Sequence, residues 1–491
     1  CWPTPPPVAT RASSRCPLRA LPRPADRRQV SNARLLRARR TLRVWLLTAR
    51  NGARFLAHRT RRLFTHHTRH EALDSRFAIR TSEDVARELG NMKGALMKFG
   101  QLLSFIVEAL PPEAQAALAT LQADAPPMSP AAAEGVVRSE LGAAPQKIFL
   151  DWHETPVAAA SVGQVHRAVT RDGRDVAVKV QYPGVGDAIE TDLANTEGMY
   201  RLVGAFALKG LDTKGLVDEL RHRMRDELDY RLEADNQREF AAHFAGHPFV
   251  SIPGVDAATS TQRVLTTEWV EGIGFTEFLA TANPAAKRRA GESIWRFTQH
   301  AIHHLGAFNG DPHPGNYRFT IDGDVTFLDF GLVKRWTPGQ WEQLLPTLEA
   351  VIVNRDPEQL MAAMEDVGFL RAGHGLAAQT VWDYVSTPYT PYLTDTFAYT
   401  RDFTKQAMAT IIDVRGPHAE VIERLNMPPS FVILDRVVWG VNAILGKLEV
   451  AAPWRAMLLE YLHDGPPATP MGEAELAWRA HSDAVHGRHE R

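Results

Sequence analysis

Four short segments, widely separated along this 491-residue chain, restrict what it can fold into. The first, residues 158–163, is a loop of small residues with the sequence AAASVG, and the second, VAVK, ends an apolar strand-like run at Lys179. In the third, DPHPGN, Asp311 and Asn316 stand five residues apart in a loop too rich in Pro and Gly to be helical. The fourth, DFG, places Asp329 directly after an apolar run with strand character. A lysine, two carboxylates and an amide are therefore expected at strand ends and in rigid loops.

These residue types have the chemistry that phosphoryl transfer from a nucleotide requires. A loop with few side chains lets backbone N–H groups approach phosphate oxygens. A rigid loop can point the Asp311 carboxylate at an acceptor or a water molecule, and the oxygens of Asn316 and Asp329 suit Mg²⁺. Each segment alone has an ordinary structural interpretation, such as a tight turn or an edge charge. Their joint order and spacing instead indicate a nucleotide site.

The rest of the pattern predicts the fold class α+β. Alternating and β-branched residues predict strands over 162–169 and 176–181, joined by a hairpin turn at Asp172-Gly173. Further strands are predicted over 252–255 and 263–269. The predicted helices cover 83–109, 130–141 and much of 185–245, and after residue 273 the pattern is mainly helical except for a small hairpin of 317–321 and 325–328.

The four segments resemble the protein-kinase fold. In that fold Lys179 would be the strand lysine and Asp311 the catalytic Asp. Asn316 and Asp329 would be the two metal-binding residues. Three departures point to a subfamily, since alanines replace the glycine-rich loop, no His-Arg pair precedes Asp311, and His313 replaces the basic residue usual two positions after it.

These departures, together with the motif KFGQ at residues 98–101, resemble the UbiB/AarF family of atypical kinase-like proteins, also called the ADCK family. A Glu-x-Asp motif at Glu227-Leu228-Asp229 and the DPHPGN loop are further marks of that family. The resemblance extends over about residues 85–460 and includes Arg436 on a late helix. It implies a protein-kinase-like, two-lobed α+β fold with an N-terminal helical extension packed over the nucleotide cleft.

Resemblance and composition together divide the chain into five expected parts. These are a basic, disordered or peripheral segment of residues 1–80, a helical extension carrying the lysine-x-glycine-glutamine motif at 81–147, an N-lobe at 148–272, a mainly helical C-lobe at 273–465 and a C-terminal tail at 466–491.

The resemblance also implies roles for individual residues, with ATP and Mg²⁺ as cofactors. Asp311 and Lys179 would be catalytic, and Asn316 and Asp329 would hold the metal. The residues expected to contact the nucleotide are Ala158, Ala159, Ala160, Ser161, Lys179, Glu233, Glu268 and Val270, where Glu268 and Val270 would offer backbone groups to the adenine edge. The residues expected to regulate the site are Lys98, Gln101, Glu227 and Asp229.

The pairing of lysines and acids stays open in the sequence. By family position Glu233 would meet Lys179, and Lys98 of the extension would reach Glu227 and Asp229. On an ideal helix Glu227 lies about 200° from Asp229, so a regular helix cannot point all three acids into one cleft. Which acid meets Lys179 and which meets Lys98 is therefore not fixed.

Charge is unevenly distributed along the chain. Residues 1–80 contain 19 Arg, no Lys and three acids, a net charge of +16, whereas the remainder has 37 basic and 54 acidic residues, a net charge of −17. The basic, partly apolar run of 42–64 suits an anionic membrane surface or the acidic body of the chain itself. The arginines would bind nucleic acid only nonspecifically, and a membrane explains them equally well, so nucleic acid is not the expected partner.

Cysteine content and hydropathy bear on the compartment. Both cysteines, Cys1 and Cys16, lie in the basic segment, so the remaining chain has no internal disulfide, which is typical of a reducing compartment. No run of about 18 uncharged apolar residues predicts a membrane-spanning helix. We expect a cytoplasmic protein that is peripheral to a membrane.

The resemblance implies ATP hydrolysis that supports the biosynthesis or handling of a quinone or another isoprenoid lipid, at a membrane surface or in a biosynthetic protein complex. Two alternatives stay open. One is a kinase that phosphorylates a small molecule or a protein once the extension moves aside, and the other is a nucleotide-gated lipid-binding scaffold with negligible turnover. Asn309-Gly310 stand where the family usually has His-Ala, which leaves the turnover rate more open than the fold.

Overall fold

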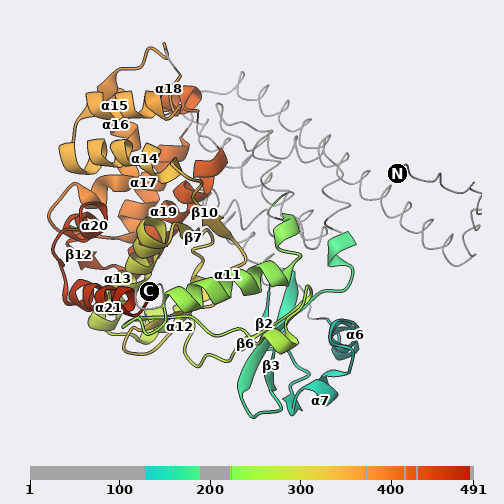
Figure 1. Ribbon diagram of the computed structural model, residues 1–491. Coiled ribbons are helices and arrows are strands. Elements are labelled where there is room, and N and C mark those ends of the chain that lie inside the picture. Colours follow the sequence, from blue (N-terminus) through green and yellow to red (C-terminus); the bar gives the residue numbers. More distant parts are fainter. Residues whose placement is uncertain are drawn as a thin grey trace, which may run out of the picture. The chain divides into compact units, whose positions relative to one another are not determined.

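The computed structural model describes residues 128–486, apart from 161, 188, 190–221, 223, 372, 414–415 and 427–428. The expected basic segment, the predicted helix of 83–109, Lys98, Gln101 and Ser161 all lie outside the described residues. In the described part an antiparallel sheet precedes a mainly helical region (Figure 1), and the expected α+β class is confirmed. Of the helices described, none has both the length and the apolar character needed to cross a bilayer.

The first part of the described chain is a five-stranded antiparallel sheet. Strand β3 (Gly163–Val169) pairs with β4 (Asp175–Gln181), and Gly173 in the turn between them has a φ of 87°. This is the left-handed conformation that the Asp-Gly turn favours, so the expected hairpin is confirmed. The other strands are β1 (Asp151–Trp152), β2 (Ala158–Ala159) and β6 (Val264–Glu268), in the order β1-β3-β4-β6 with β2 also paired with β3.

Different helices pack on the two faces of this sheet. Every second residue of β4 is a valine packed against α6 (Pro130–Leu141), and the short α7 (Pro145–Ile148) follows. Lys179 lies between two of these valines, so it faces the opposite side of the sheet. On that side α11 (Tyr230–His243) packs through Tyr230 and Ala234. The sheet therefore points Lys179 toward α11.

The second part is mainly helical around the largely buried α13 (Pro284–His300). Its core includes Trp295 and Trp454, whose ring centroids are 5.8 Å apart. The other helices are α12 (Phe275–Thr281), α14 (Gln340–Leu348), α15 (Pro357–Asp366), α16 (Ala378–Val385), α17 (Arg401–Ile412), α18 (Ala419–Arg424), α19 (Pro429–Leu448), α20 (Trp454–Leu462) and α21 (Pro470–His486). Two π-helical turns, Ala301–Leu305 and Glu349–Asn354, and two 3₁₀ turns, Pro314–Asn316 and Thr387–Tyr392, also belong to this part, whereas a third 3₁₀ turn, Ala257–Thr259, precedes β6 of the sheet.

Short strands in this region differ from the prediction. The expected hairpin is present as β8 (Tyr317–Phe319) and β9 (Val325–Phe327), but the predicted strand of 252–255 is replaced by β5 (Val250–Ser251). Pro253 has no N–H to donate to a ladder, which ends that strand early. The sequence pattern does not predict two further strand pairs. Strand β7 (Ala307–Asn309) pairs with β10 (Val333–Arg335), and β11 (Phe397–Ala398) pairs with β12 (Ala451–Ala452). Strands of two or three residues are too short to show an alternating pattern.

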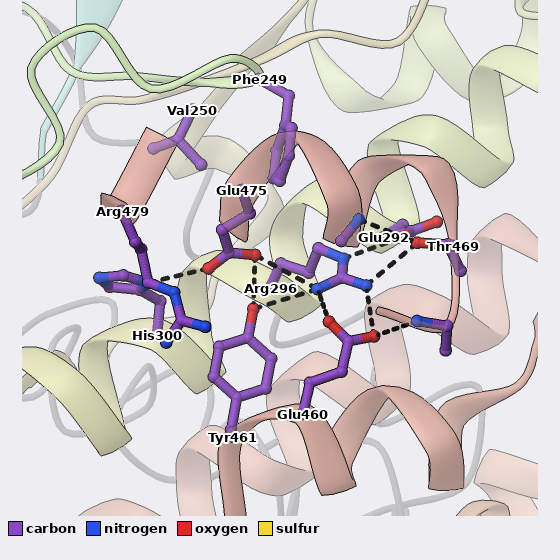
Figure 2. Close-up of polar contacts among 12 residues, drawn as sticks. Phe249, Val250, Glu292, Arg296, His300, Glu460, Tyr461, Thr469, Glu475 and Arg479 are labelled. Atoms are coloured by element: carbon purple, nitrogen blue, oxygen red, sulfur yellow. Dashed lines mark hydrogen bonds and ion pairs between the residues drawn. The ribbon is translucent and has the colours of Figure 1, made fainter. Parts of the chain in front are cut away.

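A buried polar cluster joins α13, α20 and α21 (Figure 2). Arg296 of α13 is 1% exposed and donates to Glu460 through two nitrogens, at 2.8 and 2.9 Å. It also donates to Glu292 at 2.8 Å and to Glu475 of α21 at 3.3 Å. Residues 466–491, expected as a tail, thus contain a helix whose acid is paired inside the C-terminal core.

His247, between α11 and β5, is held in its neutral form. Its Nδ1 accepts hydrogen bonds from the backbone N–H groups of Val250 at 3.2 Å and Phe249 at 3.5 Å, which a protonated Nδ1 cannot accept. Burial lowers the pKa of His247 to about 3. The charge of Glu475 opposes this shift, while those of His300, His243 and Arg296 add to it.

This predicts a loss of stability at mildly acidic pH. The pKa of His247 is about 3 in the folded chain, below the usual value of 6.5, so its contribution to stability is present above pH 6.5 and is lost as the pH falls toward 3. We expect the free energy of unfolding to fall by about 1–2 kcal/mol from this residue between pH 7 and 5. Guanidinium unfolding at both pH values measures it, with His247→Gln as the comparison. Equal pH dependence in both proteins would contradict the assignment.

Candidate active site

Lys179 of β4 forms a buried ion pair with Glu233 of α11. Lys179 Nζ lies 2.9 Å from Glu233 Oε1, 2.8 Å from Glu233 Oε2 and 3.9 Å from Asp329 Oδ2. Burial by itself lowers the pKa of Lys179, but the carboxylates of Glu233 and Asp329 outweigh it and hold that pKa well above its usual value. Burial also raises the pKa of Glu233 to about 7, although Lys179 lowers it. The structure thus brings these three expected residues together around a charged lysine.

The DFG segment is fixed against α11. Phe330 is fully buried, and its ring centroid lies 5.0 Å from that of Phe240. Asp329 Oδ1 accepts a hydrogen bond from Gly331 N at 2.9 Å. This bond leaves the other carboxylate oxygen of Asp329 facing the lysine.

The chain just before α11 is not helical, which changes where its acids point. Asp229 is the N-cap of α11, and its Oδ1 accepts from Arg231 N at 3.1 Å. The Arg231 side chain donates to both Asp229 oxygens, at 2.9 and 2.7 Å, and holds the pKa of Asp229 below its usual range. A Cβ added to Gly331 would lie 3.6 Å from Glu227 Oε1 and 3.7 Å from Glu233 Oε2. Glu227 and Glu233 therefore gather at Gly331, an arrangement that an unbroken helix does not allow.

Asp311 and Asn316 are joined within one loop, which is also tied to Asp329. Asn316 Nδ2 donates to Asp311 O at 3.0 Å and to Asp311 Oδ2 at 3.3 Å. Asn309 Oδ1 accepts from Asp311 N at 2.9 Å, and Asn309 Nδ2 donates to Asp329 O at 2.6 Å. The asparagine that replaces the family's usual histidine thus connects the two carboxylate-bearing loops.

Helix α19 contacts this loop from behind. Arg436 donates to Asp311 Oδ1, and the two side chains are 9% and 10% exposed. One turn further along, a Cβ added to Gly440 would lie 2.3 Å from Pro312 Cγ, so a glycine is needed for the helix to come this close. The loop therefore has a rigid backing, and its carboxylate is paired with a buried guanidinium.

The alanine-rich segment forms a tight hairpin. Ala158 and Ala159 make up β2 and pair with β3, and Ala160 N donates to Gly163 O at 2.9 Å. In this structure the hairpin turn uses the N–H of Ala160, and the expected contact of the alanine-rich segment with phosphate stays a prediction. A Cβ added to Gly163 would lie 2.3 Å from Val180 O, so only glycine allows this close approach of β3 to β4.

Glu268 and Val270 lie where the chain leaves the sheet. Glu268 is the last residue of β6, and its N–H donates to Gly254 O at 2.9 Å. Its Oε2 accepts from Gly254 N at 2.7 Å. Val270 follows the strand and is half-buried. Because the N–H of Glu268 is engaged, any contact of its backbone with an adenine edge falls to its carbonyl oxygen.

The oxygens of Asn316 and Asp329 suit a divalent cation that arrives with a nucleotide. The two residues stand at the open end of the β8–β9 hairpin, where Leu328 N donates to Asn316 O at 2.9 Å. Since Asn316 Nδ2 is used on Asp311, its Oδ1 is the amide atom left for a cation. No group of three His, Cys, Asp or Glu side chains able to hold a metal occurs in the described part. Mg²⁺ is commonly held by one or two carboxylates plus substrate phosphates, so the donors present fit Mg²⁺ bound together with phosphate.

Sequence reasoning gave no role to two residues that complete this site. The sequence pattern places Arg436 only on a late helix, although a lone arginine within the apolar run FVILDRVVW is a signal of a buried ion pair. Asn309 stands out in the sequence only as a departure from the family pattern. Lys98, Gln101 and Ser161 lie outside the described residues, so the structure places none of them at the site.

Known proteins with similar sequences are also kinase-like. The family model of the ABC1 atypical kinase-like domain matches residues 120–364. The chloroplastic Protein ACTIVITY OF BC1 COMPLEX KINASE 1 of Arabidopsis thaliana is 35% identical over 294 residues, which are 57% of this chain and 42% of the relative. A chloroplastic aarF domain-containing protein kinase of the same plant is 33% identical over 401 residues, 79% of this chain and 54% of the relative. The chain thus spans about half the length of the curated relatives it matches.

One solved structure is matched over a larger share of its own length than the plant relatives are. The structure of the complex of Rv3197 with erythromycin, from Mycobacterium tuberculosis, has 35% sequence identity and a TM-score of 0.57, and the match covers 78% of this chain and 95% of that chain. The kinase-like fold expected from the four segments is therefore confirmed for the described part. Together, the family model and this near-complete match to a homologue show that the chain belongs to the UbiB/AarF family of ABC1 atypical kinase-like proteins.

Proposed function

We propose that this protein binds Mg·ATP at the Lys179 and Asp329 side chains and hydrolyses it as an atypical kinase-like ATPase. One observation carries the proposal: Lys179 is paired with Glu233 at 2.8 Å and lies 3.9 Å from Asp329. Phosphoryl transfer by the kinase fold requires both a lysine–glutamate pair and an aspartate placed for the metal. The described chain holds all three in one arrangement.

The remaining side chains supply positioning. Lys179 would hold the α- and β-phosphates, and Asn316 and Asp329 would hold Mg²⁺, which neutralises charge on the phosphates. Asp311 would orient the attacking water. The Asp311 carboxylate is fixed for that role by Arg436 on one oxygen and by Asn316 on the other.

We propose further that hydrolysis supports the biosynthesis or handling of a quinone or another isoprenoid lipid at a membrane surface. The resemblance to the UbiB family supports the lipid class. The net charge of +16 in residues 1–80 supports attraction to an anionic leaflet on the cytoplasmic side. A biosynthetic protein complex is a compatible setting for the same activity.

Two other functions share the same nucleotide site. The printed names of the plant relatives describe kinases, which supports transfer of phosphate to a small-molecule or protein acceptor. A nucleotide-gated lipid scaffold would need Mg·ATP binding without turnover. The presence of Lys179, Asp311, Asn316 and Asp329 together favours turnover, because a scaffold without catalysis is free to lose this combination.

Replacing Asp329 with asparagine tests the site. Because the carboxylate is the charged oxygen donor facing Lys179, Asp329→Asn is expected to weaken Mg·ATP binding at least about tenfold, or about 1.4 kcal/mol. Titration calorimetry with and without Mg²⁺ measures the affinity, and phosphate release measures turnover, both with the full chain and with anionic or neutral liposomes. Asp322→Asn, at an exposed turn residue of the same hairpin, is the control and should leave both quantities unchanged.

The outcomes separate the three functions. Phosphate release that anionic liposomes increase and that Asp329→Asn removes supports the membrane-stimulated ATPase. Transfer of label from γ-³²P-ATP to an acceptor supports the kinase. Mg²⁺-dependent binding without release or transfer supports the scaffold, and no binding of Mg·ATP by the unsubstituted chain overturns all three.

A further inference from the structure

The side chain of Trp478 on α21 packs on the C-terminal end of α11. Its Nε1 donates to Ala245 O at 3.0 Å, and its ring is stacked on Phe244 with 6.1 Å between centroids and 3° between planes. The Trp478 ring also packs edge-on against the ring of His247, with 4.4 Å between the two centroids. The last carbonyls of a helix have no partner within the helix, so α21 supplies a hydrogen bond just beyond the point where α11 ends.

A second connection runs through two histidines. Glu475 of α21 is 3% exposed, and its Oε1 lies 2.8 Å from His300 Nδ1. The other ring nitrogen of His300 lies 2.9 Å from Nε2 of His243, the last residue of α11. Figure 2 shows Glu475 between His300 and the Arg296 side chain, which fixes α21 to α13. The end of α11 is thus joined to the buried polar cluster.

The opposite end of α11 carries Glu233. Glu233 and His243 are ten residues apart on one helix, which corresponds to about 15 Å at 1.5 Å per residue. A tilt of the helix by roughly 10° about its C-terminal end would move Glu233 by about 2.5 Å. Such a shift is comparable with the 2.8 Å between Lys179 Nζ and Glu233 Oε2, so it would break the ion pair.

We propose that α21 is a positioning element for the active site, in which Trp478 and Glu475 hold the C-terminal end of α11 and thereby keep Glu233 on Lys179. Phe240 of α11 packs on Phe330, so the same restraint keeps the DFG segment in place. Neither Trp478 nor Glu475 touches the proposed nucleotide site. The effect on catalysis rests on the proposed ATPase function, whereas the effect on the Lys179–Glu233 pair does not.

The reactivity of Lys179 tests this without nucleotide. Its side chain is 15% exposed and paired with Glu233, so an amine-reactive acetylating reagent should label it slowly in the full chain. In Trp478→Ala we expect its labelling, measured by mass spectrometry, to rise at least about threefold relative to that of exposed Lys147. Leu476→Ala, at a residue of the same helix that is 45% exposed, is the matched control and should leave the labelling unchanged.

A milder substitution keeps the test informative if Trp478→Ala does not fold. Trp478→Phe keeps an aromatic ring on Phe244 and removes only the donor to Ala245 O, and we expect a smaller but measurable rise in Lys179 labelling. A parallel rise in KM for Mg·ATP, with unchanged circular dichroism, links the restraint to nucleotide binding. Unchanged labelling in either folded variant would overturn the proposal, even where the chain hydrolyses ATP. Absence of hydrolysis in the unsubstituted chain would overturn the proposed function and leave the labelling result to decide on α21.

Discussion

Lys179→Met should lower phosphate release from Mg·ATP by about 100- to 1,000-fold, the loss typical of removing one preorganised group that stabilises developing charge. The protein should stay folded. Burial already raises the pKa of Glu233 to about 7, and Lys179 is the neighbour that lowers it. Without the lysine Glu233 takes up a proton at neutral pH, so no uncompensated charge is left in the interior. Steady-state phosphate release together with thermal unfolding measures both expectations.

Paired variants separate the lysine from its partner. Glu233→Gln leaves Lys179 to move toward Asp329, and we expect about a 100-fold loss of activity from its displacement. The double variant should be no less active than Lys179→Met alone, because residues that act as a unit are not additive. Lys147→Met, at an exposed lysine of α7, is the control. Loss of activity by less than about threefold in Lys179→Met would contradict the proposed role.

Arg296→Met is expected to have the largest effect on stability. Arg296 is 1% exposed and is paired with the carboxylates of Glu292, Glu460 and Glu475. Removing the guanidinium leaves buried acids without their cation, and breaking a buried pair in this way costs about 3–5 kcal/mol. Equilibrium unfolding in guanidinium chloride at pH 7 measures the change in the free energy of unfolding.

An exposed ion pair provides the contrast. Arg138 pairs with Glu134 on α6, where the two side chains are 61% and 34% exposed. Arg138→Met should change the free energy of unfolding by no more than about 0.5 kcal/mol, because solvent screens such pairs. The loss of unfolding free energy in Arg296→Lys should lie between the losses in the other two variants. A lysine ammonium keeps the positive charge but lacks the several directed donors of a guanidinium. A loss below about 1 kcal/mol in Arg296→Met would show that the cluster reorganises or admits water.

Local features of the fold could be predicted from the sequence because their causes are local. Helix α6 matches the predicted helix of 130–141, with Ser129 accepting from Ala132 N at its start and Gly142 at a φ of 79° after its end. The β3–β4 hairpin follows from the Asp-Gly turn. The grouping of a lysine, two aspartates and an asparagine was also predictable. The order and spacing of the four segments can be read directly from the sequence, and they resemble the protein-kinase fold.

The exact partners of those residues were not predictable. The sequence left open how three acids of the 227–233 region point, because helical periodicity assumes an unbroken helix. The structure starts α11 after Asp229, so this residue caps the helix and pairs with Arg231 while Glu227 and Glu233 gather at Gly331. An N-cap aspartate is a readable signal, but the direction of Glu227 depends on the turn that precedes the helix.

The sequence by itself determined the α+β class, the order of the segments and the chemistry of Lys179, Asp311, Asn316 and Asp329. Only the tertiary structure decided that Arg436 pairs with Asp311 and that Trp478 holds the end of α11. These pairs are 125 and 233 residues apart in the chain. Periodicity and turn preferences describe neighbours within a few residues, whereas contacts at such separations are set by how helices pack once the core has formed.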